Sequence, residues 1–424
     1  MGWRHSVRAR WHRAGRHRTT TVVSTIAIGE SIAIVLISSP ARVHPSTDMT
    51  WRTLGTTCML DGLDRCPIQI VCDGYRTPTD LEASHAARIL PQLERDPAAL
   101  SKKGIVRGDL GDAYEKYKAQ LHIDIAERGL SERVSVEELG SHHGFAMCVR
   151  HALERCDRRF ALIMQHDRCF IRGLATHDLA RILATFDEPT LVRYVGFPSS
   201  TSKRLATRLA PKYKLGPLLA QRSRELRPGL CLRPSNFWFD SNHIVHAERA
   251  LAVLFAPLEQ RQASMPLVLA KRLGAPGPLD GDLYDDLHGT LRRLTLRVGD
   301  FIEDRFGTEQ RALLSRLHDD PALCLQAFDW TGCYLLEEMV ERGGTVGRGG
   351  TLAASAADED WSERLDTALL EGTVEDHFCD LLDSRGRATF VAHIDARGAV
   401  PREWSRGLPL LQGHAEPQPP GAET

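Results

Sequence analysis

The sequence predicts an α/β fold in which a doubly wound, mainly parallel sheet is flanked by helices. Three short apolar runs, at residues 32–37 (IAIVLI), 68–72 (IQIVC) and 160–164 (FALIM), have the length and character of buried strands. Each run ends at a turn or breaker, and segments with helical spacing of apolar residues lie between the runs. Strands that alternate with helices usually form parallel sheets, because each helix carries the chain back across the sheet.

The chain begins with a basic segment, in which six arginines and no acid occur among the first nineteen residues. An apolar stretch from Val22 to Ile37 follows, with Glu30 near its middle. A central charge costs about 2.5–3.5 kcal/mol in a membrane-spanning helix. We therefore expect residues 1–30 to form a disordered or targeting leader and residues 32–38 to form the first strand. A cytoplasmic protein is favoured, with a membrane anchor or organelle targeting as alternatives.

The remaining elements are expected to alternate along the chain. Ser46 or Thr47 is placed to cap a helix that runs to about Met59. Further elements are expected at 68–72 (strand), around Tyr114 and Tyr117 (helix), at 134–139 (strand), from Gly144 (helix), at 160–164 (strand) and at 191–197 (strand). One domain should span residues 31–400, with a flexible insertion at 343–360 and a disordered tail at 401–424, because both segments have little apolar content.

Composition excludes several classes of protein. The net charge of −1 argues against a nucleic-acid partner. Ten cysteines without a CxxC pair indicate reduced thiols rather than a disulfide framework or a zinc ribbon. The sequence has no P-loop, GxGxxG or GxSxG motif, which disfavours an ATPase, a dehydrogenase or an α/β-hydrolase.

Acidic residues follow two of the predicted strands. Asp73 follows the strand at 68–72, and Asp167 follows the strand at 160–164. Open α/β sheets bind their ligands beyond the carboxyl ends of the strands, and we expect Asp73 and Asp167 to lie at the carboxyl ends of neighbouring parallel strands. An aspartate at such a position can hold a divalent cation, and the cation can hold a diphosphate. Each aspartate alone is also explained as an ordinary turn residue.

Four segments with chemically suitable residues occur in a defined order. Asp73 ends a strand, Gly144 and Arg150 lie in the first part of a helix, Asp167 ends the next strand, and the pair Glu303-Asp304 comes much later. This order resembles the GT-A glycosyltransferases, specifically the inverting family-2-like enzymes. The chain from about Ile32 to Arg397 also resembles uncharacterised glycosyltransferase-like proteins of algae and bacteria. The shared motifs are HPS (44–46), CDG (72–74), HHGF (142–145), QHD (165–167), FIED (301–304) and HxDxR (393–397).

The resemblance implies a GT-A-like domain with a nucleotide-binding half at 31–200 and an acceptor half at 201–400. It implies transfer of a sugar, with inversion, from a nucleotide-sugar donor to a hydroxyl of a glycan, lipid or small-molecule acceptor. Asp304 would be the catalytic base beside Glu303, and Asp167 would hold Mn²⁺ or Mg²⁺ with help from His166 or His393. The nucleotide-binding residues would be Asp73, His143, Gly144 and Arg150.

The segment 232–251 is a further candidate for the acceptor site. Trp238 lies beside the polar residues Asp240 and His243, and aromatic faces next to hydrogen-bonding groups are typical of sugar subsites. Three adjacent aromatics at 237–239 are equally typical of a core strand. Similarly, Arg150 is explained as a solvated helix residue, and Glu303-Asp304 as a charged helix start.

The sequence departs from the family at the metal motif. The usual Asp-any-Asp reads Gln165-His166-Asp167, which leaves one carboxylate. The pair Glu303-Asp304 is not followed by Gln-x-x-Arg-Trp, so the chain is no close match to processive polysaccharide synthases. Two other functions therefore stay open: a non-catalytic module that binds a nucleotide or sugar, and another metal-dependent α/β enzyme such as a phosphoryl hydrolase.

Overall fold

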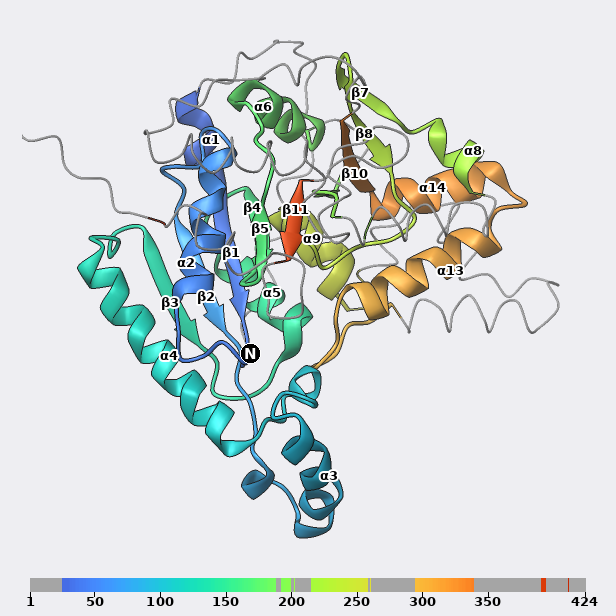
Figure 1. The fold of residues 1–424 in the computed structure, drawn as a ribbon. Helices are drawn as coiled ribbons and strands as arrows, with labels where there is room; N and C mark the ends of the chain where they lie inside the picture. Colours follow the sequence, from blue (N-terminus) through green and yellow to red (C-terminus); the bar gives the residue numbers. More distant parts are fainter. Residues whose placement is uncertain are drawn as a thin grey trace, which may run out of the picture.

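The computed structural model describes residues 25–187, 192–199, 202, 215–257, 260, 294–338, 390–393 and 411 (Figure 1). The predicted insertion at 343–360, Asp395 and Arg397 of the HxDxR motif, and nearly all of the leader and tail lie outside these residues. The end of the leader is an exception, because residues Thr25–Ser31 form helix α1 rather than a disordered segment. No helix among the described residues is long and apolar enough to span a bilayer.

A nine-stranded sheet forms the centre of the molecule and confirms the predicted α/β class. Its strand order is β3-β2-β1-β4-β9-β6-β10-β8-β7. Strands β1 to β4 are mutually parallel, β6 is parallel to β10, and β9 runs antiparallel between β4 and β6. The strands are β1 Ile32–Ser38, β2 Ile68–Cys72, β3 Val134–Glu138, β4 Phe160–Gln165, β6 Tyr194–Gly196, β7 Arg224–Arg227, β8 Leu230–Pro234, β9 His243–His246 and β10 Cys333–Glu338.

Helices flank the sheet, and α4 lies beside the outer strand β3 (Figure 1). A separate two-stranded ribbon pairs β5, Arg168–Phe170, with β11, Val391–His393. The α-helices are α1, α2 Asp48–Gly55, α3 Ala83–Arg95, α4 Gly108–Glu127, α5 Gly144–Arg155, α6 Thr176–Thr185, α8 Gly216–Ala220, α9 Ala247–Ala250, α13 Thr308–Arg316 and α14 Pro321–Thr331. Short 3-10 turns lie at Thr56–Met59, Pro78–Asp80 and Ser101–Lys103, and π-helical turns at Leu251–Phe255 and Glu303–Gly307.

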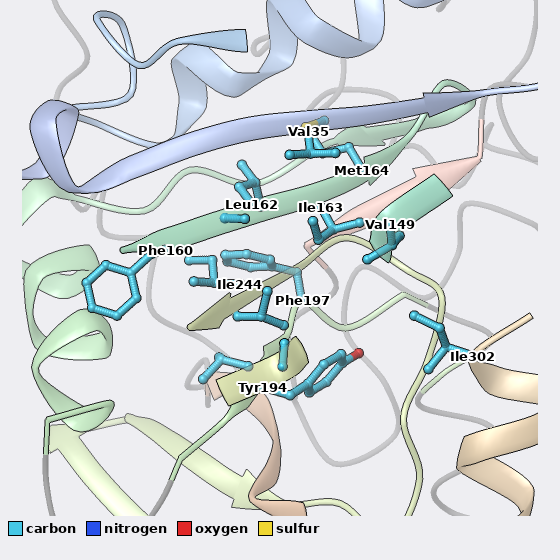
Figure 2. Close-up of a cluster of buried hydrophobic side chains, with 14 of the residues drawn as sticks. Val35, Val149, Phe160, Leu162, Ile163, Met164, Tyr194, Phe197, Ile244 and Ile302 are labelled. Atoms are coloured by element: carbon cyan, nitrogen blue, oxygen red, sulfur yellow. The ribbon is translucent and has the colours of Figure 1, made fainter. Parts of the chain in front are cut away.

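The central strands are covered on both faces, as continuous apolar runs in a parallel sheet require. All seven residues of β1 and the first five of β4 are buried. Figure 2 shows Leu162, Ile163 and Met164 of β4 near Val35 of β1 and Val149 of α5. The nine described cysteines are free thiols, which agrees with the reduced state predicted from their spacing.

The strand order creates a switch point at β1. The chain places β2 on one side of β1 and β4 on the other, and such divergence opens a crevice at the carboxyl edge of a doubly wound sheet. Register pairs Ser38 with Cys72 and Ile37 with Gln165, so the three strands end at the same level. The sequence predicted that the strands preceding Asp73 and Asp167 are immediate neighbours, and this is wrong, because β2 and β4 lie on either side of β1.

A stacked aromatic group supports the turn that follows β1. The ring of His44 lies 5.0 Å from that of Tyr114 and 4.1 Å from that of Tyr117, both on α4. Tyr114 donates a hydrogen bond to the Ser38 carbonyl oxygen at 3.2 Å, so α4 also fixes the end of the strand. Burial, with a smaller contribution from His166, lowers the pKa of His44 to about 2. His44 is therefore neutral in the folded protein at ordinary pH.

We expect His44 to make stability fall in mild acid. Its folded pKa lies below the ordinary value of 6.5, so unfolding takes up a proton below that pH, and the stability present above it is lost as pH falls. One such group contributes about 1 kcal/mol between about pH 7.5 and about pH 5.5. Urea unfolding at both pH values measures how much the free energy of unfolding falls between them. This fall should be smaller by about 1 kcal/mol in His44→Gln than in the wild type. Equal losses in the two proteins would contradict this explanation.

Candidate functional site

A cavity of about 430 Å³ lies at the carboxyl edge of the sheet, at the switch point. It collects residues from the ends of β1, β2 and β4, from the loop before β9 and from the segment before α13. Its charged and polar lining includes Arg42, Asp73, Lys102, His142, Gln165, His166, Asp167, Arg168, Asp240, Glu303 and Asp304, and Gly144 and Phe301 also contribute to the wall. Seven of the residues selected from the sequence therefore meet in one cavity.

Asp73 holds the start of helix α5 against the end of β2. Its Oδ1 accepts a hydrogen bond from the backbone N–H of His143 at 2.7 Å, and its Oδ2 accepts one from Gly144 at 3.0 Å. The carboxylate thus caps a helix from a distant point in the sequence and compensates the positive end of the helix dipole. Because these two helix N–H groups are already bonded, they are not available to a bound phosphate.

His142, rather than His143, faces the cavity. The Nδ1 atom of His142 lies 2.8 Å from Asp73 Oδ2, which fixes the ring. Its Nε2 atom is buried and has no hydrogen-bond partner. His143 instead brings its Nδ1 atom within 2.6 Å of the Ser141 carbonyl oxygen and does not line the cavity. The sequence identified the His-His pair but not which of the two rings is oriented toward a ligand.

Two glycines allow this loop to pack closely. Gly144 has a φ of +76°, and a Cβ there would lie 2.6 Å from the Cα of Gly299. Gly104 has a φ of +66°, and a Cβ there would lie 2.0 Å from Cγ of His142. A side chain at either position would be strained and would displace the loop or the ring. Gly144 therefore serves to position the loop, besides lining the cavity.

Hydrogen bonds to the backbone hold the end of β4 and the following strand β5 near the segment 240–242 and near β11. The side-chain amide of Gln165 donates a hydrogen bond to the Asp240 carbonyl oxygen at 2.9 Å. Asn242 donates one to the Arg168 carbonyl oxygen at 2.9 Å. Strand β11 pairs with β5 so that the backbone of His393 lies opposite that of Arg168. The C-terminal part of the chain thus returns directly beside the 165–167 motif.

Three acids from two loops lie on the other side of the cavity. The backbone N–H of Glu303 donates to Asp240 Oδ1 at 3.2 Å, and the Asp240 nitrogen lies 3.5 Å from Glu303 Oε2. Burial and the charge of Glu303 raise the pKa of Asp240 well above its ordinary range. Burial likewise raises the pKa of Glu303. Asp304, by contrast, is exposed and lines the cavity.

Cationic side chains that the sequence did not single out also line the cavity. Arg42 pairs with Asp96 at 2.5 Å, and the ammonium group of Lys102 lies 5.0 Å from the centre of the Phe301 ring. The charge of Arg168 acts on both Asp240 and Glu303 and opposes the rise in their pKa values. Arg168 directly follows the 165–167 motif in the sequence, whereas Arg42 and Lys102 lie in loops whose position depends on the whole fold.

Besides His143, the side chains of Arg150, Trp238 and His243 lie away from the cavity. Arg150 is exposed on α5 and pairs with Glu154 at 2.8 Å, which is the solvated role considered from the sequence. Trp238 is fully buried between the rings of Tyr194 and Phe306, because its segment packs in the core. His243 is also buried, which lowers its pKa to about 4. Trp238 and His243 therefore do not form an acceptor surface, although Asp240 between them reaches the cavity.

The donor set for a divalent ion is small. Within the described part of the chain, no group of three His, Cys, Asp or Glu side chains is placed to hold a metal ion by itself. The cavity wall offers the carboxylate of Asp167 beside the imidazole of His166. These donors fit an ion that takes its other ligands from a bound diphosphate and water. A nitrogen ligand suits Mn²⁺ better than Mg²⁺.

No protein-family model and no curated protein matches the sequence. Several solved structures are similar. The structure of a mannosyltransferase from Pyrobaculum calidifontis, in complex with GDP-Man and Mn²⁺, aligns over 81% of each chain with a TM-score of 0.31 and 10% identity. Glucosyl-3-phosphoglycerate synthase from Mycobacterium tuberculosis, in complex with Mn²⁺, UDP and glucosyl-3-phosphoglycerate, aligns over 74% of this chain and 86% of its own, with a TM-score of 0.27 and 15% identity. S. aureus TarS aligns over 52% of this chain and 48% of its own, with a TM-score of 0.23 and 10% identity.

We expect Asp73→Ala to destabilise the protein by about 2 kcal/mol or more, because it leaves two helix N–H groups and the His142 ring without their acceptor. Asp304→Ala is the matched control, since this carboxylate lines the same cavity but is exposed, and it should cost at most about 0.5 kcal/mol. Urea unfolding of both variants measures the difference. Equal stabilities would mean that Asp73 has no capping role.

Proposed function

We propose that the protein is a glycosyltransferase that transfers a sugar from a nucleotide-sugar donor to a hydroxyl group, with inversion at the anomeric carbon. One observation carries this proposal. The segments that contain Asp73, Gly144, Asp167 and the pair Glu303-Asp304 are far apart in the sequence and line a single cavity at the sheet's switch point. Their order along the chain is the order from which the family resemblance was inferred.

The donor would lie across the strand ends, with its nucleoside near Asp73 and His142. Asp73 contributes mainly by orienting the ring, because its carboxylate already accepts two backbone N–H groups and lies 2.8 Å from the His142 ring nitrogen. The Nε2 atom of His142 is then the polar atom at this end of the cavity that lacks a partner. Lys102 and Arg168 line the same cavity and would contact the phosphates. Such fixed groups orient a ligand without the cost of ordering them upon binding.

A divalent ion, when bound by Asp167 with His166, would neutralise charge on the leaving nucleoside diphosphate. The backbone of β11 brings His393 beside this segment, so His393 is retained as a candidate third ligand. Phe301 and Lys102 close one side of the cavity, and exclusion of water from that side would limit hydrolysis of the donor.

Asp304 is the proposed catalytic base. A base must reach the proton that it removes, and the exposed Asp304 side chain is available within the cavity. Glu303 is instead engaged with the backbone of Asp240, which suits a role in positioning the segment. The acceptor oxygen attacks the anomeric carbon while its proton passes to Asp304. The bond from that carbon to the diphosphate oxygen breaks, and the nucleoside diphosphate leaves.

A non-catalytic module that binds a nucleotide or sugar is the second candidate. The observation that favours it is the single carboxylate of the 165–167 motif, together with the small donor set for a metal ion. Incubation of the wild-type protein with UDP- and GDP-sugars separates the two candidates. Release of nucleoside diphosphate supports the transferase, whereas binding without any release supports the module.

We expect Asp304→Asn to lower transfer by about 10²–10⁴-fold, because it removes the proton acceptor but keeps the size of the side chain. Affinity for the nucleoside diphosphate should be unchanged. Glu303→Gln is the matched control and should lose less activity, since it leaves the base in place. Initial rates and calorimetric affinities of both variants test this assignment. Full activity of Asp304→Asn would move the base elsewhere, and full activity of both variants would make the segment structural.

Nucleoside-diphosphate binding should be strengthened by Mn²⁺ through Asp167. Because the protein supplies few ligands, Mn²⁺ and the diphosphate should each bind more weakly without the other. Calorimetry of UDP and GDP with and without Mn²⁺ should show this coupling in the wild type and its loss in Asp167→Ala. Asp64→Ala removes an acid outside the cavity and should keep the coupling. An Asp167→Ala protein with wild-type coupling would remove Asp167 from the metal site.

A further inference from the structure

A cluster of arginines lies at the opposite edge of the sheet from the candidate cavity. Arg159 precedes β4 and Arg193 precedes β6, so both lie at the amino ends of these strands. His246 ends the antiparallel strand β9 and therefore lies at the same edge, and Arg249 follows on α9. We call Arg159, Arg193, His246 and Arg249 the amino-edge cluster.

Strand register brings the members of this cluster together. His246 pairs with Phe160, and the β6–β9 register, continued by one residue, places Arg193 opposite His246 on the other side. Cross-strand neighbours project from the same face of a sheet. Consistent with this, the rings of His246 and Phe160 are 5.6 Å apart, and Nε of Arg159 lies 3.4 Å from Nε2 of His246.

The cations of the cluster are poorly compensated. Arg159 pairs with the exposed Asp187, and Arg249 donates a hydrogen bond to the Phe186 carbonyl oxygen. Arg193 is 7% exposed and forms no ion pair among the described residues. Burial and the nearby charge of Arg249 lower the pKa of Arg193 to about 10, so the two cations repel each other. Among the described residues, Asp187 and the exposed Glu248 are the acids that act on Arg249.

Two buried polar atoms of the cluster have no hydrogen-bond partner. One is Nε of Arg193, which is always a donor. The other is Nδ1 of His246. Arg159 donates to Nε2 of this ring, so the proton of the neutral imidazole resides on Nδ1. The atoms left without partners are therefore both donors.

We propose that the amino-edge cluster binds a tetrahedral oxyanion, such as the phosphate of a phosphorylated small molecule, between Arg193 and Arg249. An oxyanion would accept from the unused donors and relieve the repulsion between the guanidinium groups. Guanidinium groups match phosphate oxygens in pairs and form charge-assisted hydrogen bonds. Because the cluster and the candidate cavity lie at opposite edges of the sheet, this site does not depend on the proposed function.

Inorganic phosphate is the probe, and calorimetry at about pH 7.5 with ionic strength held constant by NaCl is the measurement. We expect the wild type to bind phosphate, and Arg193→Gln and Arg249→Gln each to weaken that binding by about tenfold or more, as the loss of a charge-assisted hydrogen bond predicts. Arg95→Gln removes an exposed arginine elsewhere and should bind as the wild type does. Lys102→Gln weakens any phosphate bound in the candidate cavity, so the binding that this variant keeps is the binding assigned to the amino-edge cluster.

Absence of phosphate binding by the wild type would overturn the proposal. So would binding that Lys102→Gln abolishes while both cluster variants keep it. Arg193 is buried and its replacement can impair folding, so thermal melts accompany each titration. If Arg193→Gln does not fold, Arg249→Gln, at a less buried position, decides the outcome. Loss of sugar transfer without loss of phosphate binding would affect only the proposed function.

Discussion

The carboxylate of Asp73 is the contact on which the geometry of the cavity depends. It joins the end of β2 to the start of α5 and fixes the His142 ring, so three parts of the site take their positions from one side chain. A buried carboxylate is costly unless its oxygens are hydrogen-bonded, and two backbone N–H donors meet that requirement here, with the His142 ring nitrogen 2.8 Å away. The close approach of Gly144 to Gly299 then brings the segment before Glu303 toward the same edge. Asp73 thus has a structural role whether or not it also contacts a nucleotide.

Local sequence patterns were sufficient to predict the central strands and the α/β class of the fold. The run at 32–38 and the run at 68–72 match β1 and β2, because buried parallel strands are continuous apolar segments with clear ends. The meeting of distant residues in one cavity followed from the rule that parallel strands share a carboxyl edge. The order of strands across the sheet did not follow from pattern, and so β1 was not expected between the strands that precede Asp73 and Asp167.

Side-chain direction was the main feature that could not be predicted. Trp238 and Asp240 are two residues apart, yet one is in the core and the other reaches the cavity, because the irregular segment before β9 has no fixed alternation. The same limit applied to the neighbours His142 and His143, whose rings have different environments. Residues such as Arg42 and Lys102 carry no local signal, since their place in the wall depends on loops held by the rest of the fold.

The charges of the cavity explain how one carboxylate at the 165–167 motif is compatible with a diphosphate ligand. Asp73 is compensated by two backbone N–H donors and the nearby His142 ring, and the raised pKa of Asp240 favours its neutral form. The remaining acids, Asp167, Glu303 and Asp304, face the cations Lys102 and Arg168, because Arg42 is already paired with Asp96. These side chains do not compensate the negative charge of a diphosphate. A second carboxylate at the 165–167 motif would add to the repulsion between the protein and the diphosphate. On the proposed function, a divalent ion that arrives together with the donor supplies the missing charge, and a single protein carboxylate is sufficient to place it.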